Sequence, residues 1–316
     1  MFEEFCIIQE NLAVCNLDYY NGYSLTWNGR QLMVMDMNAG QFRYSFTYND
    51  EGIRTSKTYG STTHYYTLNG SQIVTETWVT KTQDGEEIVE HPNHFLVYLY
   101  DESGAPIGLQ YRSKSDAKNV FYTYYFEKNL QGDIIAIYTE DGTKIGSYTY
   151  DAWGNCTYSY ATGATTVQKK IVQMFNPFRY RGYYYDYDTG LYYLQSRYYN
   201  PTTGRFINAD GYVSTGTGLL GYNMYAYCGN NPVIYEDRDG CACVVCLDPY
   251  GLENPVGNPA TRGGALGAGG ALLALAMVIV YSYSTQLPDV AVAPAFPERK
   301  KGNGKRQKQK KKKRIS

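Results

Sequence analysis

The fold of this chain is decided by residues 176–200, which read NPFRYRGYYYDYDTGLYYLQSRYYN. The aromatic residues between Phe178 and Tyr184 alternate toward one side, as they do in a half-buried strand. A turn is expected at Asp186–Gly190, because Asp bonds its own backbone and Gly adopts a positive φ at little cost. Residues 191–199 then return as a second strand. The pattern therefore predicts an antiparallel β-hairpin.

A looser version of the same unit recurs through the first half of the chain: an aromatic strand, an Asp/Asn-Gly turn and a second strand. Copies lie at residues 27–30, 48–54, 100–104, 129–133, 138–142 and 150–155. One hairpin cannot bury its own face, so the units must stack into a long sheet. Their irregular spacing does not fit the fixed blades of a propeller, and it favours a winding sheet.

The composition agrees with a fold made of strands. The chain has 316 residues, of which 36 are tyrosine and 32 are glycine. Residues of this kind suit pleated, half-buried strands joined by tight turns, so an all-helical fold is excluded. We predict an all-β fold in which antiparallel hairpins of residues 1–175 form a curved or spiralling sheet, a partial β-shell. Residues 176–240 form a separate, denser region.

Short motifs follow one another closely in this second region. They are Arg179–Tyr184, Asp188–Tyr193, Arg197–Pro201, Gly204–Ile207, Asn223–Tyr227 and Asn230–Val233. Through these motifs, residues 176–240 resemble the Rhs repeat-associated core region of the Rhs/YD-repeat proteins. With the looser YD-like units, the resemblance covers about residues 20–240.

The resemblance implies a component of a polymorphic toxin system, secreted or exposed at the surface of a bacterium. In this family a ribbon of YD repeats is wound into a hollow shell that encloses a toxic C-terminal polypeptide. The core region closes the shell and in many members cleaves the cargo free. The implied partners are the chain's own C-terminal segment as cargo and an immunity protein. A spiral sheet of this kind also removes most edge strands.

The resemblance also implies a catalytic pair, Asp210 and Asp237. In the family two aspartates bracket the core and act as an aspartyl-protease-like dyad. Two carboxylates held close together cannot both ionise cheaply, so one stays protonated as an acid while the other activates water. The bond to be cleaved is then Gly240–Cys241 or Cys241–Ala242, and the resemblance implies an aspartyl autoprotease.

The residues after the two aspartates depart from the family pattern, which has proline there. This chain has Gly211 and Arg238 instead. A guanidinium of Arg238 beside the dyad would favour the ionised form of both carboxylates. The alternative is that Asp210 and Asp237 are turn residues that bond their own backbone. Asp248, which precedes a proline, is either a displaced second carboxylate or part of an ordinary turn.

Two further groups have metal-ligand residue types. Cys241, Cys243 and Cys246 are closely spaced, but structural zinc takes four ligands and no histidine follows, so small apolar filler in a linker is favoured. His91 and His94 flank a proline, and a surface turn that enters the following strand is the favoured interpretation. We therefore predict neither a metal nor a cofactor.

The end of the chain changes character after a linker at residues 241–262. Residues 263–283 contain no charged residue and predict one apolar helix. Its segment 264–283 inserts into a membrane or, alternatively, packs inside the shell.

Residues 284–316 predict a disordered basic tail. Residues 298–316 carry eleven Lys or Arg and one Glu, so the rest of this chain of net charge −1 is acidic. With no aromatic residue to stack on bases, residues 299–314 are expected to bind polyanions through charge alone.

Residues 1–10 contain no basic residue and no long apolar run, so no N-terminal signal peptide is expected in this chain. The leading hypothesis is a β-shell wall that encloses and presents a C-terminal cargo, with aspartyl autoproteolysis near residue 240. The alternative is a cell-surface carbohydrate-binding or adhesin YD-repeat protein, because exposed tyrosines stack on sugar rings. A membrane-tethered scaffold is a third possibility.

Overall fold

A computed structural model of the chain describes residues 16–37, 40–84, 87–211, 223–241 and 243–245. Strands dominate these residues. The helical elements within them are single turns: α1 at Thr166–Lys170, a π-turn at Ile171–Phe175, and 3₁₀ turns at Tyr180–Gly182 and Cys228–Asn230. The predicted all-β class is confirmed.

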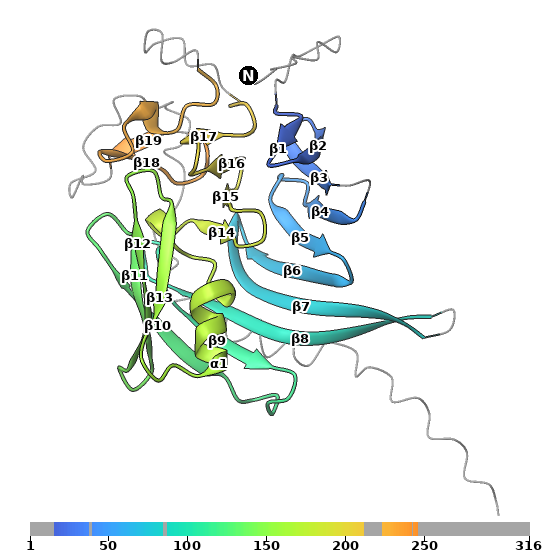
Figure 1. The fold of residues 1–316 in the computed structure, drawn as a ribbon, viewed down its shortest axis with the longest axis vertical. Helices are drawn as coiled ribbons and strands as arrows, with labels where there is room; N and C mark the ends of the chain where they lie inside the picture. Colours follow the sequence, from blue (N-terminus) through green and yellow to red (C-terminus); the bar gives the residue numbers. More distant parts are fainter. Residues whose placement is uncertain (1–15, 38–39, 85–86, 212–222, 242, 246–316) are drawn as a thin grey trace, which may run out of the picture.

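The first part of the chain forms one large antiparallel sheet whose strands are ordered as in the sequence (Figure 1). Within the described residues its strands are β1 Tyr19–Tyr20, β2 Tyr23–Asn28, β3 Gln31–Met37, β4 Phe42–Tyr48, β5 Arg54–Tyr59, β6 Thr62–Asn69, β7 Gln72–Asp84, β8 Glu87–Tyr100, β9 Pro106–Ser113, β10 Tyr122–Lys128, β11 Ile134–Thr139, β12 Lys144–Tyr150 and β13 Cys156–Tyr160. This order is the one that consecutive hairpins produce, as the repeated unit predicted.

The turns between these strands use the predicted chemistry. After β8, the Asp101 carboxylate accepts hydrogen bonds from the backbone N–H groups of Ser103 and Ala105, at 2.9 and 3.0 Å. Gly104 has a φ of +81° and donates its N–H to the Asp101 carbonyl oxygen. A side chain at this position would be strained, so the glycine fixes where the chain reverses.

A small sheet of four strands follows: β14 Tyr184–Asp186, β15 Leu191–Leu194, β16 Arg197–Asn200 and β17 Arg205–Phe206. The hairpin between β14 and β15 confirms the expected turn at residues 186–190. The prediction of a single returning strand over residues 191–199 was wrong. Gln195 takes a φ of +59°, so the chain reverses again and β16 pairs back on β15.

One face of the large sheet packs against this small sheet and the turns before it. Tyrosines from β4 to β12 are buried there together with aromatic residues of 175–198. The cluster includes Tyr44, Tyr66, Tyr98, Tyr111, Tyr124 and Tyr148 from the large sheet, and Phe175, Phe178, Tyr184, Tyr193 and Tyr198 from the later segment. The strands of the large sheet lie on both sides of β14–β17 in Figure 1. The chain's own residues therefore fill the space that these tyrosines line.

Buried charges also join the two sheets. Asp186 of β14 is fully buried, and its Oδ2 lies 2.5 Å from Nη1 of Arg54 on β5. Its Oδ1 lies 3.2 Å from Nζ of Lys57, which also contacts Asp188. The guanidinium of Arg54 lies over several aromatic rings, the nearest being Tyr193 at 4.3 Å from the centroid. The small sheet is thus held by ion pairs as well as by apolar packing.

The two histidines flanking Pro92 lie in strand β8, so the surface turn predicted for them was wrong. Pro92 pairs with Val79 of β7 at a register shift, where the ladder tolerates a residue without an N–H. His91 bonds the Thr82 hydroxyl, whereas His94 bonds the Tyr111 hydroxyl. The two side chains therefore have different partners.

A third, two-stranded sheet pairs β18 Tyr235–Asp237 with β19 Cys243–Val245. The predicted apolar helix at 263–283, the basic tail at 284–316, Asp248 and Cys246 all lie outside the described residues, as do residues 1–15. In the part of the chain that is described, no helix combines the length and the apolar character needed to cross a membrane.

Candidate active site

Asp210 and Asp237 share one arginine, Arg197, whose side chain is buried at the start of β16. Nη1 of Arg197 lies 3.0 Å from Oδ2 of Asp210, and Nη2 lies 2.9 Å from Oδ2 of Asp237. The guanidinium also stacks on Phe206, 3.7 Å from the ring centroid. The structure therefore brings together the two aspartates that the sequence motif singled out.

Arg197 itself was given no role from the sequence. The cation expected beside the dyad was Arg238, and that expectation was wrong: Arg238 is 74% exposed and pairs with Glu236 at 2.7 Å. A signal for Arg197 was present, because it stands among tyrosines that are buried on both strand faces. An arginine is tolerated there only with charged or polar partners.

Asp237 is fully buried at the end of β18, and this decides its protonation. Burial raises the pKa of Asp237 to about 6, although Arg197 opposes the shift; the neighbouring Asp239 and Asp210 add to it. The backbone N–H of Asp237 donates to the Tyr183 hydroxyl at 2.9 Å. Near neutral pH this carboxyl is therefore able to exchange a proton, as a general acid or base must.

Both polar ends of the Gly240–Cys241 peptide bond are held by this cluster. Nε of Arg197 donates a hydrogen bond to the Gly240 carbonyl oxygen. On the other side of the bond, the Cys241 N–H points between two carboxylates, at 3.0 Å from Oδ1 of Asp237 and 3.0 Å from Oδ1 of Asp239. Of the two bonds proposed from the sequence for cleavage, this one lies at the aspartates. Ala242, on the far side of the other bond, is outside the described residues.

Gly240 is required for this fit. Its φ is +74°, and a Cβ added there would lie 2.6 Å from the Leu194 carbonyl oxygen, 2.7 Å from Ser196 Oγ and 3.0 Å from the Arg197 nitrogen. The contacts with Leu194 and Ser196 are shorter than real Cβ atoms show, and the contact with Arg197 is tight. The segment can therefore lie against the β15–β16 turn only with glycine at this position.

The same turn holds the residue before Gly240. The Ser196 hydroxyl donates to the Asp239 carbonyl oxygen at 2.8 Å, and the Ser196 N–H points to the same oxygen at 3.3 Å. The Cys241 thiol lies 3.2 Å from Ser196 Oγ. Sequence reasoning missed Ser196, since nothing in its surroundings marks it out before the turn is known.

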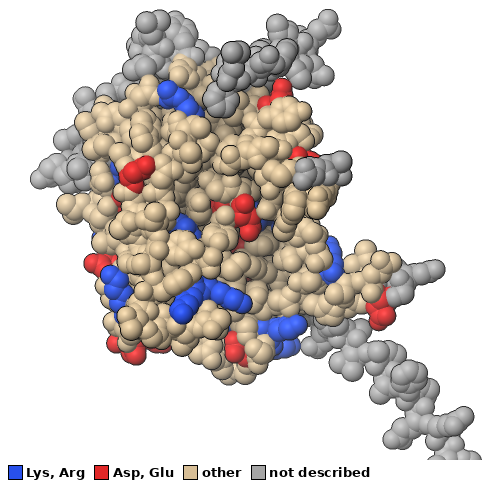
Figure 2. Space-filling model, in the orientation of Figure 1, with Lys and Arg blue, Asp and Glu red and all other residues tan. Residues whose placement is uncertain are grey.

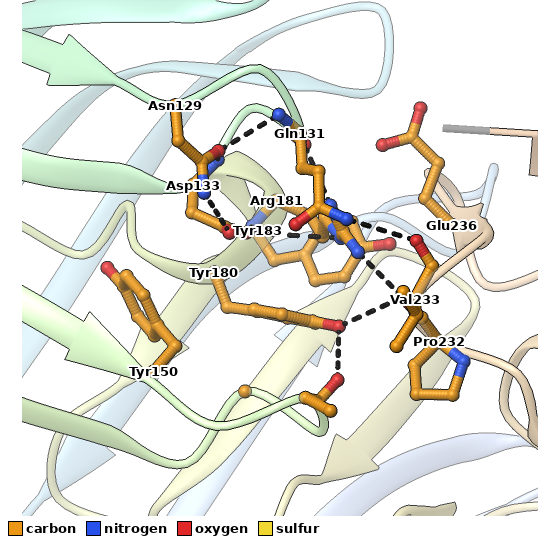
Figure 3. Close-up of polar contacts among 12 residues, drawn as sticks. Asn129, Gln131, Asp133, Tyr150, Tyr180, Arg181, Tyr183, Pro232, Val233 and Glu236 are labelled. Carbon is orange, nitrogen blue, oxygen red and sulfur yellow. Dashed lines mark hydrogen bonds and ion pairs between the residues drawn. The ribbon is translucent and has the colours of Figure 1, made fainter. Parts of the chain in front are cut away.

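The loop that leads to Asp237 is fixed by the large sheet (Figure 3). Arg181 donates to the Pro232 carbonyl oxygen at 2.6 Å and to the Gln131 carbonyl oxygen at 3.2 Å, and its N–H bonds Asp133. Gln131 in turn donates to the Val233 carbonyl oxygen at 3.0 Å. Strand β18 thus starts from a position set by the β10–β11 turn, which explains how Asp237 reaches Arg197.

The sulfur atoms that the structure describes give no metal-ligand set. Of the three clustered cysteines, Cys241 is described and contacts Ser196, whereas Cys246 lies outside the described part. Among the residues that the structure places, no group of three His, Cys, Asp or Glu side chains is arranged to bind a metal ion.

Comparisons with known proteins locate the chain among larger bacterial proteins. No protein-family model matches it. It is 31% identical over 222 residues to the tRNA3(Ser)-specific nuclease WapA of Bacillus spizizenii, and 35% identical over 108 residues to toxin subunit YenC2 of Yersinia entomophaga. These alignments cover 69% and 34% of this chain.

The chain is a relative of bacterial toxin-type proteins. Its fold is also found in a crystal structure of TcdB2-TccC3-TEV, with a TM-score of 0.55 and 24% identity over 71% of this chain. The chain spans only a small part of these proteins: 8% of the WapA sequence, 10% of YenC2 and 10% of the crystallised chain. The similarity therefore concerns one region shared by much longer molecules.

Proposed function

We propose that this chain acts as part of an Rhs-type toxin-system component. The large sheet is a segment of a curved wall, and the region from residue 176 to 240 presents the following C-terminal segment as cargo and cleaves it off. The similarity to toxin-type proteins supports this proposal, as does the antiparallel fold shared with TcdB2-TccC3-TEV. Such a component is secreted or displayed at the bacterial surface and is neutralised in the producing cell by an immunity protein.

One observation carries the proteolytic part: Arg197 contacts Asp210, Asp237 and the Gly240 carbonyl oxygen at once. A cation on a carbonyl oxygen stabilises the oxyanion that forms when the carbon is attacked. The Asp237 carboxyl, which lies at the Cys241 nitrogen, is placed to give that nitrogen a proton as it leaves. Asp210 balances the charge of Arg197. The products are a Gly240 carboxylate and a Cys241 amine.

The burial of the tyrosines on the packed face of the large sheet favours a wall over a surface for sugars, although Tyr19, Tyr122 and Tyr125 are exposed elsewhere on the sheet. Tyrosines on the packed face of the large sheet are covered by residues 175–198 and offer no ring to a glycan. On the face drawn in Figure 2, the described acidic and basic side chains are interspersed, so charge marks no docking area there. Strong binding of the purified chain to a glycan array would favour the adhesin alternative.

The test of the proposal is the fate of the purified chain. Intact-mass measurement is expected to show a fragment that ends at Gly240 and a second that begins at Cys241. Asp237→Asn and Asp210→Asn should suppress both fragments, whereas Asp50→Asn, in an exposed turn, should leave them unchanged. A wild-type chain that stays intact during prolonged incubation near pH 6 would overturn the proteolytic part.

A further inference from the structure

The nucleophile of the proposed cleavage has to reach the Gly240 carbonyl carbon, and the carboxylates are already engaged. Oδ2 of Asp237 binds Arg197, and its Oδ1 accepts the Cys241 N–H. Oδ2 of Asp210 binds the same guanidinium. These contacts hold the Asp237 carboxylate at the Cys241 nitrogen, where it can exchange a proton during the reaction.

Cys241 carries a nucleophile on the leaving side of the same peptide bond. Its thiol is partly buried against the β15–β16 turn, 3.2 Å from Ser196 Oγ. Burial raises the pKa of this thiol, so it holds its proton at neutral pH and needs a base when it attacks. The carboxylates of Asp237 and Asp239, both 3.0 Å from the Cys241 nitrogen, are the bases at hand.

We propose that the Cys241 thiol attacks the Gly240 carbonyl carbon and that self-cleavage proceeds through a thioester. This inference rests on the proposed self-cleavage and names its nucleophile. The sulfur and the carbonyl carbon belong to neighbouring residues, so the attack closes a five-membered ring of S, Cβ, Cα, N and the carbonyl carbon. A reaction within one tethered unit avoids the entropy cost of bringing a separate nucleophile to the site.

The groups at the site account for each bond and proton in this step. The thiol proton passes to the carboxylates at the Cys241 nitrogen, the S–C bond forms, and the negative charge gathers on the Gly240 oxygen that Arg197 holds. As the C–N bond breaks, the Asp237 carboxyl delivers a proton to the nitrogen. The result is a thioester between the Gly240 acyl group and the Cys241 sulfur, with a free Cys241 amine. Hydrolysis by water then gives the Gly240 carboxylate and restores the thiol.

The acyl side is also suited to this attack. Gly240 offers no side chain to hinder the carbonyl, and its packing against Leu194 and Ser196 leaves no space for one. The Ser196 hydroxyl fixes the Asp239 carbonyl, which keeps the segment from sliding along the turn. Ser196 is therefore a positioning residue for the thiol and the carbonyl together.

The experiment uses the full chain and hydroxylamine, which converts a thioester to a hydroxamate but leaves an ordinary peptide bond intact under mild conditions. The wild-type chain is expected to give a fragment that ends in a Gly240 hydroxamate, identified by mass. Cys241→Ala should lose both the hydroxamate and spontaneous cleavage. Cys241→Ser should retain a slower, hydroxylamine-sensitive cleavage, because the hydroxyl forms an ester in the same way. Cys156→Ala is the control and should behave as wild type. The Cys156 thiol, at the start of β13, contacts Arg179 and not the cleavage site.

The outcomes separate this inference from the proposed function. If Cys241→Ala still cleaves at Gly240 at the wild-type rate and no hydroxamate forms, the thiol is not the nucleophile, while self-cleavage stands. If the folded wild-type chain gives neither spontaneous nor hydroxylamine-induced fragments, self-cleavage itself is wrong, and the inference fails with it. Recovery of cleavage in Cys241→Ser but not in Cys241→Ala supports the thioester and shows that the loss in Cys241→Ala is not a folding defect.

Discussion

Replacing Asp186 with asparagine should strongly destabilise the chain. Asp186 is fully buried between Arg54 and Lys57, with contacts of 2.5 and 3.2 Å. Burial alone would raise its pKa, but Arg54 and Lys57 outweigh this and hold the pKa of Asp186 below its usual value. The carboxylate is therefore charged in the native state. Asparagine keeps the shape and removes the charge, so two buried cations lose their shared partner.

The magnitude follows from the cost of leaving buried charge uncompensated. Removal of one partner of a buried ion pair costs about 3–5 kcal/mol. For a domain of this size each kcal/mol lowers Tm by about 2–4 °C, so Tm should fall by about 6–20 °C. Thermal unfolding followed by circular dichroism measures the change. Asp50→Asn, exposed in the turn after β4, should change stability by less than about 0.5 kcal/mol.

A small effect of Asp186→Asn would refute the reasoning. If this variant unfolds within about 1 kcal/mol of the wild type, the ion cluster does not hold the small sheet against the large one. The packing of aromatic residues would then account for the junction alone. A large effect with an unchanged Asp50→Asn control supports the assignment.

The other predictions concern the cleavage cluster. Because the pKa of Asp237 rises on folding to about 6 from 3.8, the folded state binds its proton more tightly. Protonation of Asp237 therefore stabilises the folded state at low pH. The free energy of unfolding should fall by roughly 3 kcal/mol as pH rises from about 4 to above 6. Urea titrations should show this loss in the wild type and not in Asp237→Asn. Gly240→Ala should stop self-cleavage, measured by intact mass, because the added Cβ would lie 2.6 Å from the Leu194 carbonyl oxygen. The control is Gly229→Ala, which should still cleave. Gly229 also has a positive φ, but a Cβ there would meet no atom within 4 Å. Arg197→Lys should reduce the cleavage rate by at least about 100-fold, because one ammonium cannot contact two carboxylates and a carbonyl together; a rate close to wild type in the folded variant would exclude an oxyanion role for Arg197.

Much of the local structure could be predicted from the sequence. The Asp/Asn-Gly turns fixed where the chain reverses, as at Asp101–Gly104, because glycine alone takes the required φ without strain. Alternating aromatic residues then fixed the strand type, and the hairpin at residues 184–194 formed as expected. The break at Gln195 could not be seen, since a non-glycine residue with positive φ carries no composition signal.

The sequence by itself therefore determined an antiparallel β fold with reversals at known places, and its resemblance to the Rhs core region marked positions 210 and 237. Only the tertiary structure decided that Arg197, rather than Arg238, joins these aspartates, and that the peptide after Gly240 lies against them. The physical reason is distance along the chain. Turn geometry is set by neighbours in sequence. The contact between residues 197 and 240 instead requires β16 to pack against β18, which Arg181 holds in place through the Pro232 carbonyl, and this arrangement requires the whole packed sheet.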